Sequence, residues 1–293
     1  IMHPLIDECG RMYHFANLQK PRFTVISNDA DTFSRELLKR QPLFTEVADI
    51  NFYDLHTYPN KTISGSDPVA SLCFVAFNNL AEGIQMAERL RQLFYARYQT
   101  LHKPQIILIN PDDNSILSMV PGFEENLKNL NIQHIQTGQY LSKEVVVENR
   151  EKYDIIAKFI NSQFSSEILK DLADVDELWR KLSPSEKDYN RFPARHYHIK
   201  LRTMGAAIVS QTDPRDEFNL ETVSDDMRLL LARMEKNRWN AEKFLTGFVP
   251  GQYNDDKNLE KFLKKELKYH PALKTWEQIS QEEKVKDFFA FNN

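Results

Sequence analysis

The sequence predicts an α/β protein whose first half is a parallel sheet with covering helices and whose second half is helical. Short apolar, β-branched runs alternate with amphipathic stretches up to about residue 163, and this alternation is typical of βαβ units. Beyond that point the apolar residues recur with helical spacing. A chain of 293 residues is long enough for two domains, each with its own core.

The first half opens in a helix between Pro4 and Asn17, whose apolar residues fall on one face. Strands are then expected at Phe23–Ser27, Ile50–Asp54, Ser71–Phe77, Ile106–Asn110 and Ile132–Gln136. Helices are expected from about Asp31 to Arg40, around Ile84 to Phe94, and from Lys152 to Phe164. The strands are apolar almost throughout, which predicts burial on both faces of a parallel sheet.

Composition excludes several functional classes. Hydrophobic residues make up 41% and charged residues 27%, as in ordinary globular proteins. The net charge is −4 and the basic residues are interleaved with acids, so nucleic acid is not an expected partner. No apolar run approaches the roughly 20 residues that span a bilayer, and no signal peptide is visible. Cys9 and Cys73 are isolated and lack zinc spacing, which predicts reduced thiols in a cytoplasmic protein without a metal site.

Two stretches of the first half carry a family resemblance. Residues 11–30, RMYHFANLQKPRFTVISNDA, predict a helix, a short loop and a strand, and residues 152–164, KYDIIAKFINSQF, predict a closing helix. On this ground residues 1–163 are similar to the Rossmann-type domain of the TrkA-N class, which regulates potassium transport in bacteria. The resemblance implies a nucleotide or NAD-like ligand and a membrane transporter or channel as partner.

The glycine-rich turn of such a domain is missing. That turn lies between the first strand and the first helix, where backbone N–H groups hold the pyrophosphate, and this chain begins inside the first helix. Only eight glycines occur, and none forms GxGxxG. We therefore expect a fragment of a longer protein, whose remaining segment could attach it to a membrane. Asp29 is the candidate ribose ligand after its strand, and the alternative is an ordinary turn residue.

Residues 164–222 are expected to connect the two domains and to carry a basic cluster. Ser183-Pro184, followed by Glu186, predicts a helix start. The cluster consists of Lys187, Asn190, Arg191, His196 and Lys200, with Arg195 and His198 among them. Forked arginine contacts would suit an anion or phosphate. The alternative is an exposed basic helix face that pairs with the acidic helix from Asp171 to Glu177.

The most specific pattern lies in residues 223–293. An amphipathic helix with Trp239 ends near Gly247-Phe248, the acidic loop Asp255-Asp256 follows, and His270-Pro271 and Trp276 lead into a charged helix. This pattern resembles the ryanodine-receptor-type (RyR) domain, a small helical module of calcium-release channels and bacterial proteins. The resemblance implies a regulatory, ligand-sensing module without a catalytic centre.

The ligand-binding candidates of this module are Glu235, Arg238, Trp239, His270 and Trp276. An arginine beside an aromatic ring can pair with and stack on a ligand, whereas the two tryptophans can equally be core anchors of a small module. The chain departs from the family at Phe248, where tryptophan is usual, and at Lys236, where histidine is frequent. These departures leave the identity of the ligand open.

Two further features bear on function. The segment from Lys257 to Lys268 predicts an amphipathic helix, and a membrane-surface role stays open for it although acidic residues flank it. The motifs GxSxG, HExxH and Walker A are absent. His196 and His198 would share a face only in an extended segment, so the sequence predicts neither an enzyme nor a metal centre.

We therefore expect a cytoplasmic regulatory protein that senses a nucleotide-like small molecule and acts on a transporter or channel. Two alternatives remain. One is a fragment of an NAD(P)-dependent oxidoreductase, in which the missing segment supplies the glycines. The other is a protein-interaction scaffold without a small ligand. A homodimer also stays open.

Overall fold

The computed structural model describes residues 2–55, 58, 70–100, 104–110, 121–137, 143–163, 172–209, 213–215, 217–252 and 256–288. The chain divides into two compact units, the first comprising residues 1–2 and 59–151 and the second residues 3–58 and 152–293. Neither predicted boundary, at 163 or at 222, coincides with the ends of these units. The predicted positions Phe164, Asp171 and Asp255 lie outside the described residues.

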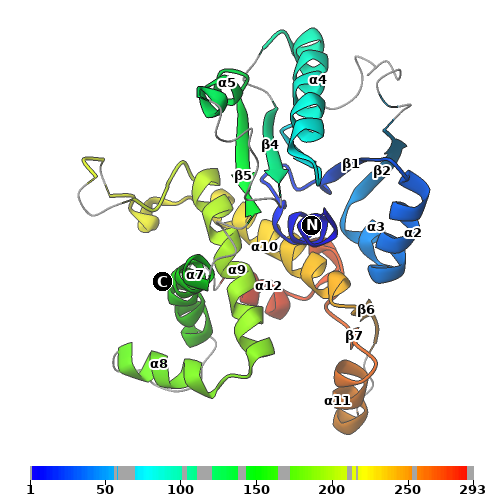
Figure 1. The fold of residues 1–293 in the computed structure, drawn as a ribbon. Coiled ribbons are helices and arrows are strands. Elements are labelled where there is room, and N and C mark those ends of the chain that lie inside the picture. Colours follow the sequence, from blue (N-terminus) through cyan, green and yellow to red (C-terminus); the bar gives the residue numbers. More distant parts are fainter. Residues whose placement is uncertain are drawn as a thin grey trace. The chain divides into compact units, whose positions relative to one another are not determined.

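The first unit contains a three-stranded parallel sheet (Figure 1). Its strands are β3 (Leu72–Ala76), β4 (Gln105–Asn110) and β5 (Ile132–Gln136), in the order β3-β4-β5, and its described helices include α4 (Leu80–Tyr98) and α5 (Phe123–Asn129). The central strand β4 is apolar almost throughout because both of its neighbours and the covering helix α4 exclude water, and Ile106 and Leu108 are fully buried. Asn79 caps α4, since its side chain accepts hydrogen bonds from two backbone N–H groups of the first turn.

The second unit begins with α1 (Met2–Met12, from His3 onward) and a two-stranded parallel sheet. Its further elements are β1 (Arg22–Ser27), α2 (Ala30–Arg40), α3 (Phe44–Val47) and β2 (Asp49–Asp54). β1 and β2 pair in parallel from Arg22 opposite Asp49 to Ser27 opposite Asp54. Val25 of β1 and the fully buried Phe44 of α3 share a core with Leu245 of α10, so this sheet packs against the helical part of the same unit.

The rest of the second unit is mainly helical. Its helices are α7 (Lys143–Gln163, from Lys152 onward), α8 (Leu172–Lys181), α9 (Pro184–Thr203), α10 (Asp225–Leu245), α11 (Lys257–Lys265) and α12 (Gln281–Phe288), with short 3-10 turns at Leu220–Thr222 and Trp276–Gln278. Ser183 and Glu186 form a capping box at the start of α9, as the sequence predicts. Gly247 adopts φ +85° just after α10, and this left-handed conformation ends the helix as expected.

The predicted strands are all present, with bounds that differ by one residue at most, and they pair in parallel. The mixed α/β class is therefore confirmed. The expectation of one sheet is not met within the described residues, because β1 and β2 form a sheet of their own on the core of the second unit. The region predicted as all-helical also contains a short parallel pair, β6 (Val249–Pro250) with β7 (Tyr269–His270). None of the described helices has the length and apolarity of a membrane span.

Candidate functional site

The RyR-type candidates on α10 lie on two neighbouring stripes of that helix. Side chains three, four or seven residues apart on an α-helix share a face. One stripe therefore holds Glu235, Arg238 and Glu242, and the next holds Lys236, Trp239 and Lys243. The first stripe is buried, whereas Trp239 of the second is partly exposed.

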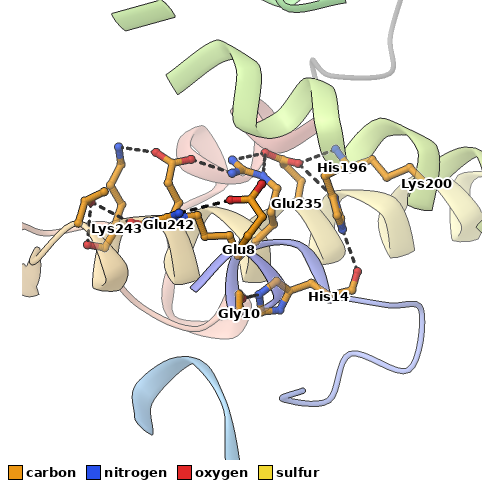
Figure 2. Close-up of polar contacts among 11 residues, drawn as sticks. Glu8, Gly10, His14, His196, Lys200, Glu235, Glu242 and Lys243 are labelled. Atoms are coloured by element: carbon orange, nitrogen blue, oxygen red, sulfur yellow. Dashed lines mark hydrogen bonds and ion pairs between the residues drawn. The ribbon is translucent and has the colours of Figure 1, made fainter. Parts of the chain in front are cut away.

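The first stripe forms a buried ionic network (Figure 2). Arg238, only 1% exposed, donates to Glu235 Oε1 from Nε at 2.9 Å and from Nη2 at 2.7 Å. Its Nη1 donates to Glu242 Oε2 at 2.7 Å. Lys200 of α9 donates to Glu235 Oε2 at 2.5 Å, and Lys243 donates to Glu242 Oε1 at 3.0 Å. All four carboxylate oxygens thus accept a bond from a cation, and the network joins α9 to α10.

The two neighbouring cations keep Glu235 ionised. Burial by itself raises the pKa of this carboxyl, but the charges of Arg238 and Lys200 more than offset it, so the pKa lies below its ordinary value. The carboxylates of Glu235 and Glu242 raise the pKa of Arg238 against the effect of burial. Arg238 is therefore a buried, charged side chain at the centre of the network, and each of its three nitrogens donates to a carboxylate.

Two buried histidines extend the polar contacts to α1 and the loop after it. His196 Nε2 lies 2.9 Å from the backbone oxygen of His14, and His14 Nε2 lies 2.9 Å from that of Gly10. Burial lowers the pKa of His14 to about 4 and that of His196 to about 3, so both rings are neutral at pH 7 and donate these bonds. Nδ1 of His196 makes no hydrogen bond within the described residues and lies 3.9 Å from Glu235 Oε2.

The second stripe belongs to a group that we name the aromatic–lysine cluster, made of Tyr189, Lys236, Trp239, Lys243, Phe248 and His270. The Trp239 and His270 rings meet edge to face, with centroids 4.9 Å apart. Lys243 Nζ lies 3.9 Å from the centroid of Tyr189, 5.6 Å from that of Trp239 and 5.4 Å from that of Phe248. Lys236 Nζ lies 4.2 Å from the Trp239 centroid and donates to the Ala272 carbonyl at 2.6 Å. Both ammonium groups therefore make cation–π contacts.

The field at His270 is positive. Burial, together with the charges of Lys264, Lys243 and Lys236, lowers the pKa of this imidazole to about 4, and Glu283 acts in the opposite direction. Its Nδ1 accepts a hydrogen bond from the Ala272 N–H at 3.2 Å. In the neutral ring the proton is therefore on Nε2, which is a donor.

The predicted basic cluster separates into two groups. His196 and Lys200 belong to the buried network. Arg191 donates to Asp154 of α7 from Nε at 2.5 Å and from Nη2 at 2.9 Å, and its charge lies 5.5 Å from the Trp179 ring centroid. Lys187 approaches the same ring at 5.8 Å, and Asn190 donates to the backbone of Glu186 at 3.0 Å. Arg191, His196 and Lys200 are buried, so they do not form an exposed basic face.

The remaining candidates have local contacts. Asp29 is exposed and caps α2, because its side chain accepts from the Thr32 N–H at 2.9 Å. This hydrogen bond lowers the pKa of Asp29, and the contact matches the turn alternative. Trp276 packs against Phe288 with ring centroids 6.0 Å apart.

Sequence reasoning did not assign Tyr189 or Lys243 to the site. Lys243 could have been found from its spacing of seven residues from Lys236 and four from Trp239. Tyr189 lies on another helix, α9, and only the fold brings it to Lys243.

Comparisons with protein-family models, with curated proteins and with solved structures found no match to this chain. The TrkA-N and RyR resemblances therefore stay predictions.

Proposed function

We propose that this chain is a non-catalytic, ligand-sensing protein that binds a nucleotide-like anion at the aromatic–lysine cluster. The observation that carries the proposal is the meeting of Trp239 and His270 at 4.9 Å within the field of three lysines. As the family resemblances imply, the ligand-bound form of the protein would regulate a membrane transporter for potassium.

The chemistry of the cluster suits a planar, negatively charged molecule. Aromatic side chains such as Trp239 and Tyr189, the latter 40% exposed, have ring faces on which a nucleobase can stack. Lys264 is exposed beside the cluster and supplies a mobile cation for a phosphate. The Nε2–H of His270 adds a directed donor, because its other nitrogen is already occupied.

The ionic network connects the aromatic–lysine cluster to the rest of the second unit. Lys243 contacts three aromatic rings and also holds Glu242, which in turn holds Arg238. A ligand that draws the Lys243 ammonium toward its phosphate weakens the bond to Glu242. Binding would then favour a different arrangement of α9 and α10, which is a population shift that needs no chemical step.

The Rossmann-like arrangement of residues 1–163 is a further part of this proposal. Its support is the parallel pairing of the strands within each of the two sheets. The binding site that we propose does not depend on it, since every residue of the aromatic–lysine cluster lies in the second unit.

Isothermal titration calorimetry with ATP, ADP, cyclic dinucleotides, NAD and NADP tests the proposal. We compare the native chain with Lys264→Gln and, as a matched control from the same helix, Lys261→Gln; both lysines are exposed. Loss of one charged contact should weaken the affinity about tenfold in Lys264→Gln and leave it unchanged in Lys261→Gln. Absence of binding for every compound, or equal affinity of the two variants, would contradict the proposal.

A further inference from the structure

Helix α11 has an apolar face that is largely open to solvent. Leu259, Phe262 and Leu263 are spaced three and four residues apart and so share one face. Leu259 is 37% exposed and Phe262 51% exposed. Leu267, just after the helix, is 50% exposed. Large apolar side chains gathered this closely are unusual on a surface that contacts only water.

Few described parts of its own unit cover this face. Among the described elements α11 packs principally against β7, and Figure 1 shows it standing beyond β6 and β7, away from α10. Its N-terminus is held by Asp256, whose carboxylate accepts from the N–H groups of Asn258 at 2.8 Å and Leu259 at 3.3 Å. The acidic residue that precedes the helix is therefore its cap.

The charges around this apolar face are mainly positive. Four exposed lysines lie on or just after α11, against two acids, Glu260 and Glu266; these lysines are Lys261, Lys264, Lys265 and Lys268. Lys261, Lys264 and Lys265 form no ion pair with any described residue. The chain as a whole carries a net charge of −4, so the charge of this segment is opposite in sign to that of the whole chain.

We propose that α11, together with Leu267, docks on the surface of an anionic lipid bilayer. The apolar side chains would enter the boundary between headgroups and acyl chains, while the lysine stems extend to the lipid phosphates. Charge complementarity favours this occupant over a second copy of the chain, because two lysine-rich faces repel each other. Docking of this kind would hold the proposed sensor at the membrane in which a transporter partner lies.

Vesicle co-sedimentation of the full chain tests the docking proposal. We use vesicles of phosphatidylcholine with about 30% phosphatidylserine, and vesicles of phosphatidylcholine alone. The native chain should sediment with the anionic vesicles only, and salt at about 0.5 M should release it. Phe262→Ser should bind about tenfold more weakly, since it removes the largest inserted side chain. The double variant Lys261→Gln/Lys265→Gln should have an affinity for the anionic vesicles that is at least about tenfold lower.

Matched controls separate a specific surface from general effects. Ile155 on α7 is 59% exposed, so Ile155→Ser removes a comparable apolar side chain elsewhere and should bind as the native chain does. Lys39→Gln/Lys274→Gln removes two exposed lysines outside α11 and should also bind normally. Lys264 is left intact because it adjoins the proposed nucleotide site.

Three results would overturn the proposal. The first is an absence of binding to anionic vesicles, and the second is equal binding by Phe262→Ser and Ile155→Ser. The third is a lipid-free dimer, seen in sedimentation velocity, that Phe262→Ser dissociates, since α11 would then be a contact between copies of the chain.

Discussion

Arg238 and Glu242, one helical turn apart on α10, are joined by a 2.7 Å bond between Nη1 and Oε2, and both side chains are only 2% exposed. A pair this deeply buried adds little net stability relative to apolar residues of the same volume. Removal of one partner, however, leaves a charge inside the protein without compensation. Arg238 therefore has a structural role within the ionic network.

Replacement of Arg238 by methionine tests this role. It leaves Glu235 and Glu242 each short of a charged partner, so the free energy of unfolding should fall by about 3–5 kcal/mol. Urea denaturation measures the change. The control is Arg233→Met on the same helix, whose ion pair with Glu277 is largely exposed and should cost less than about 1 kcal/mol. Similar losses in the two variants would show that the network is not stabilised as we describe.

Stability should fall on mild acidification. Burial lowers the pKa of His14, His196 and His270 to about 4, 3 and 4, from an ordinary value of 6.5. Between these values the unfolded chain binds protons that the folded chain does not, so stability is lost as the pH falls below 6.5. From pH 6.5 to 5 each well-buried histidine should contribute a loss of about 2 kcal/mol.

Urea denaturation at pH 7, 6 and 5 measures this pH dependence. The lowered pKa of Glu235 contributes little there, because its effect begins only below the ordinary value of 4.5. The raised pKa of Asp287, about 7, acts in the opposite direction, because this carboxyl takes up a proton in the folded chain between pH 7 and 5, so the net loss is smaller than the sum of the histidine effects. His14→Gln should therefore remove a loss of about 2 kcal/mol between pH 7 and 5, whatever its effect at pH 7. Stability that is constant from pH 7 to 5 would mean that these rings are not buried as neutral groups.

The end of α10 depends on the backbone of Gly247. At φ +85° an alanine is strained although its Cβ would meet only the flexible end of Lys268, at 3.5 Å. Gly247→Ala should lower the free energy of unfolding by about 1–2 kcal/mol. Gly247→Asn should cost less, because asparagine tolerates the left-handed region. Thermal unfolding of both variants measures these costs. An unchanged midpoint in the alanine variant would contradict the role of a left-handed residue at the end of α10.

Arg191 links α9 to α7 through a two-pronged bond to Asp154. Lysine keeps the charge but lacks the fork, so Arg191→Lys should cost on the order of 1–2 kcal/mol. Arg195→Lys is the control. The bond of Arg195 to Glu8 is partly exposed, so this exchange should leave the free energy of unfolding nearly unchanged. Equal stability of the two variants in urea would mean that Arg191 is not a clamp between the helices.

Local features of this chain could be predicted from its sequence. The strand at Ile106–Asn110 follows from an apolar, β-branched run, the start of α9 from Ser183 and Glu186, and the end of α10 from Gly247. Each depends on residues close together in the chain, where propensity and periodicity act directly.

Long-range features could not be predicted in this way. The pairing of Arg238 with Glu235 and Glu242 follows from their spacing on one helix. The bond from Lys200 of α9 to Glu235, which extends this pairing into a buried network, could not be predicted from that spacing. The separation of β1 and β2 from the other strands likewise depends on their packing against Leu245 of α10, more than 190 residues away. Periodicity identifies which face is buried, but it does not identify the partner.

The three tryptophans of the chain permit the most direct test of ligand sensing at the aromatic–lysine cluster. Trp179 packs in a separate core with α7 and α9, Trp276 packs against Phe288, and Trp239 lies in the proposed site. The measurement is a nucleotide titration followed by the indole N–H resonances in ¹H–¹⁵N NMR spectra, assigned with Trp→Phe variants. Our account predicts that a bound nucleotide shifts the Trp239 resonance most and leaves that of Trp179 in place. A nucleotide that binds without moving the Trp239 resonance would contradict it.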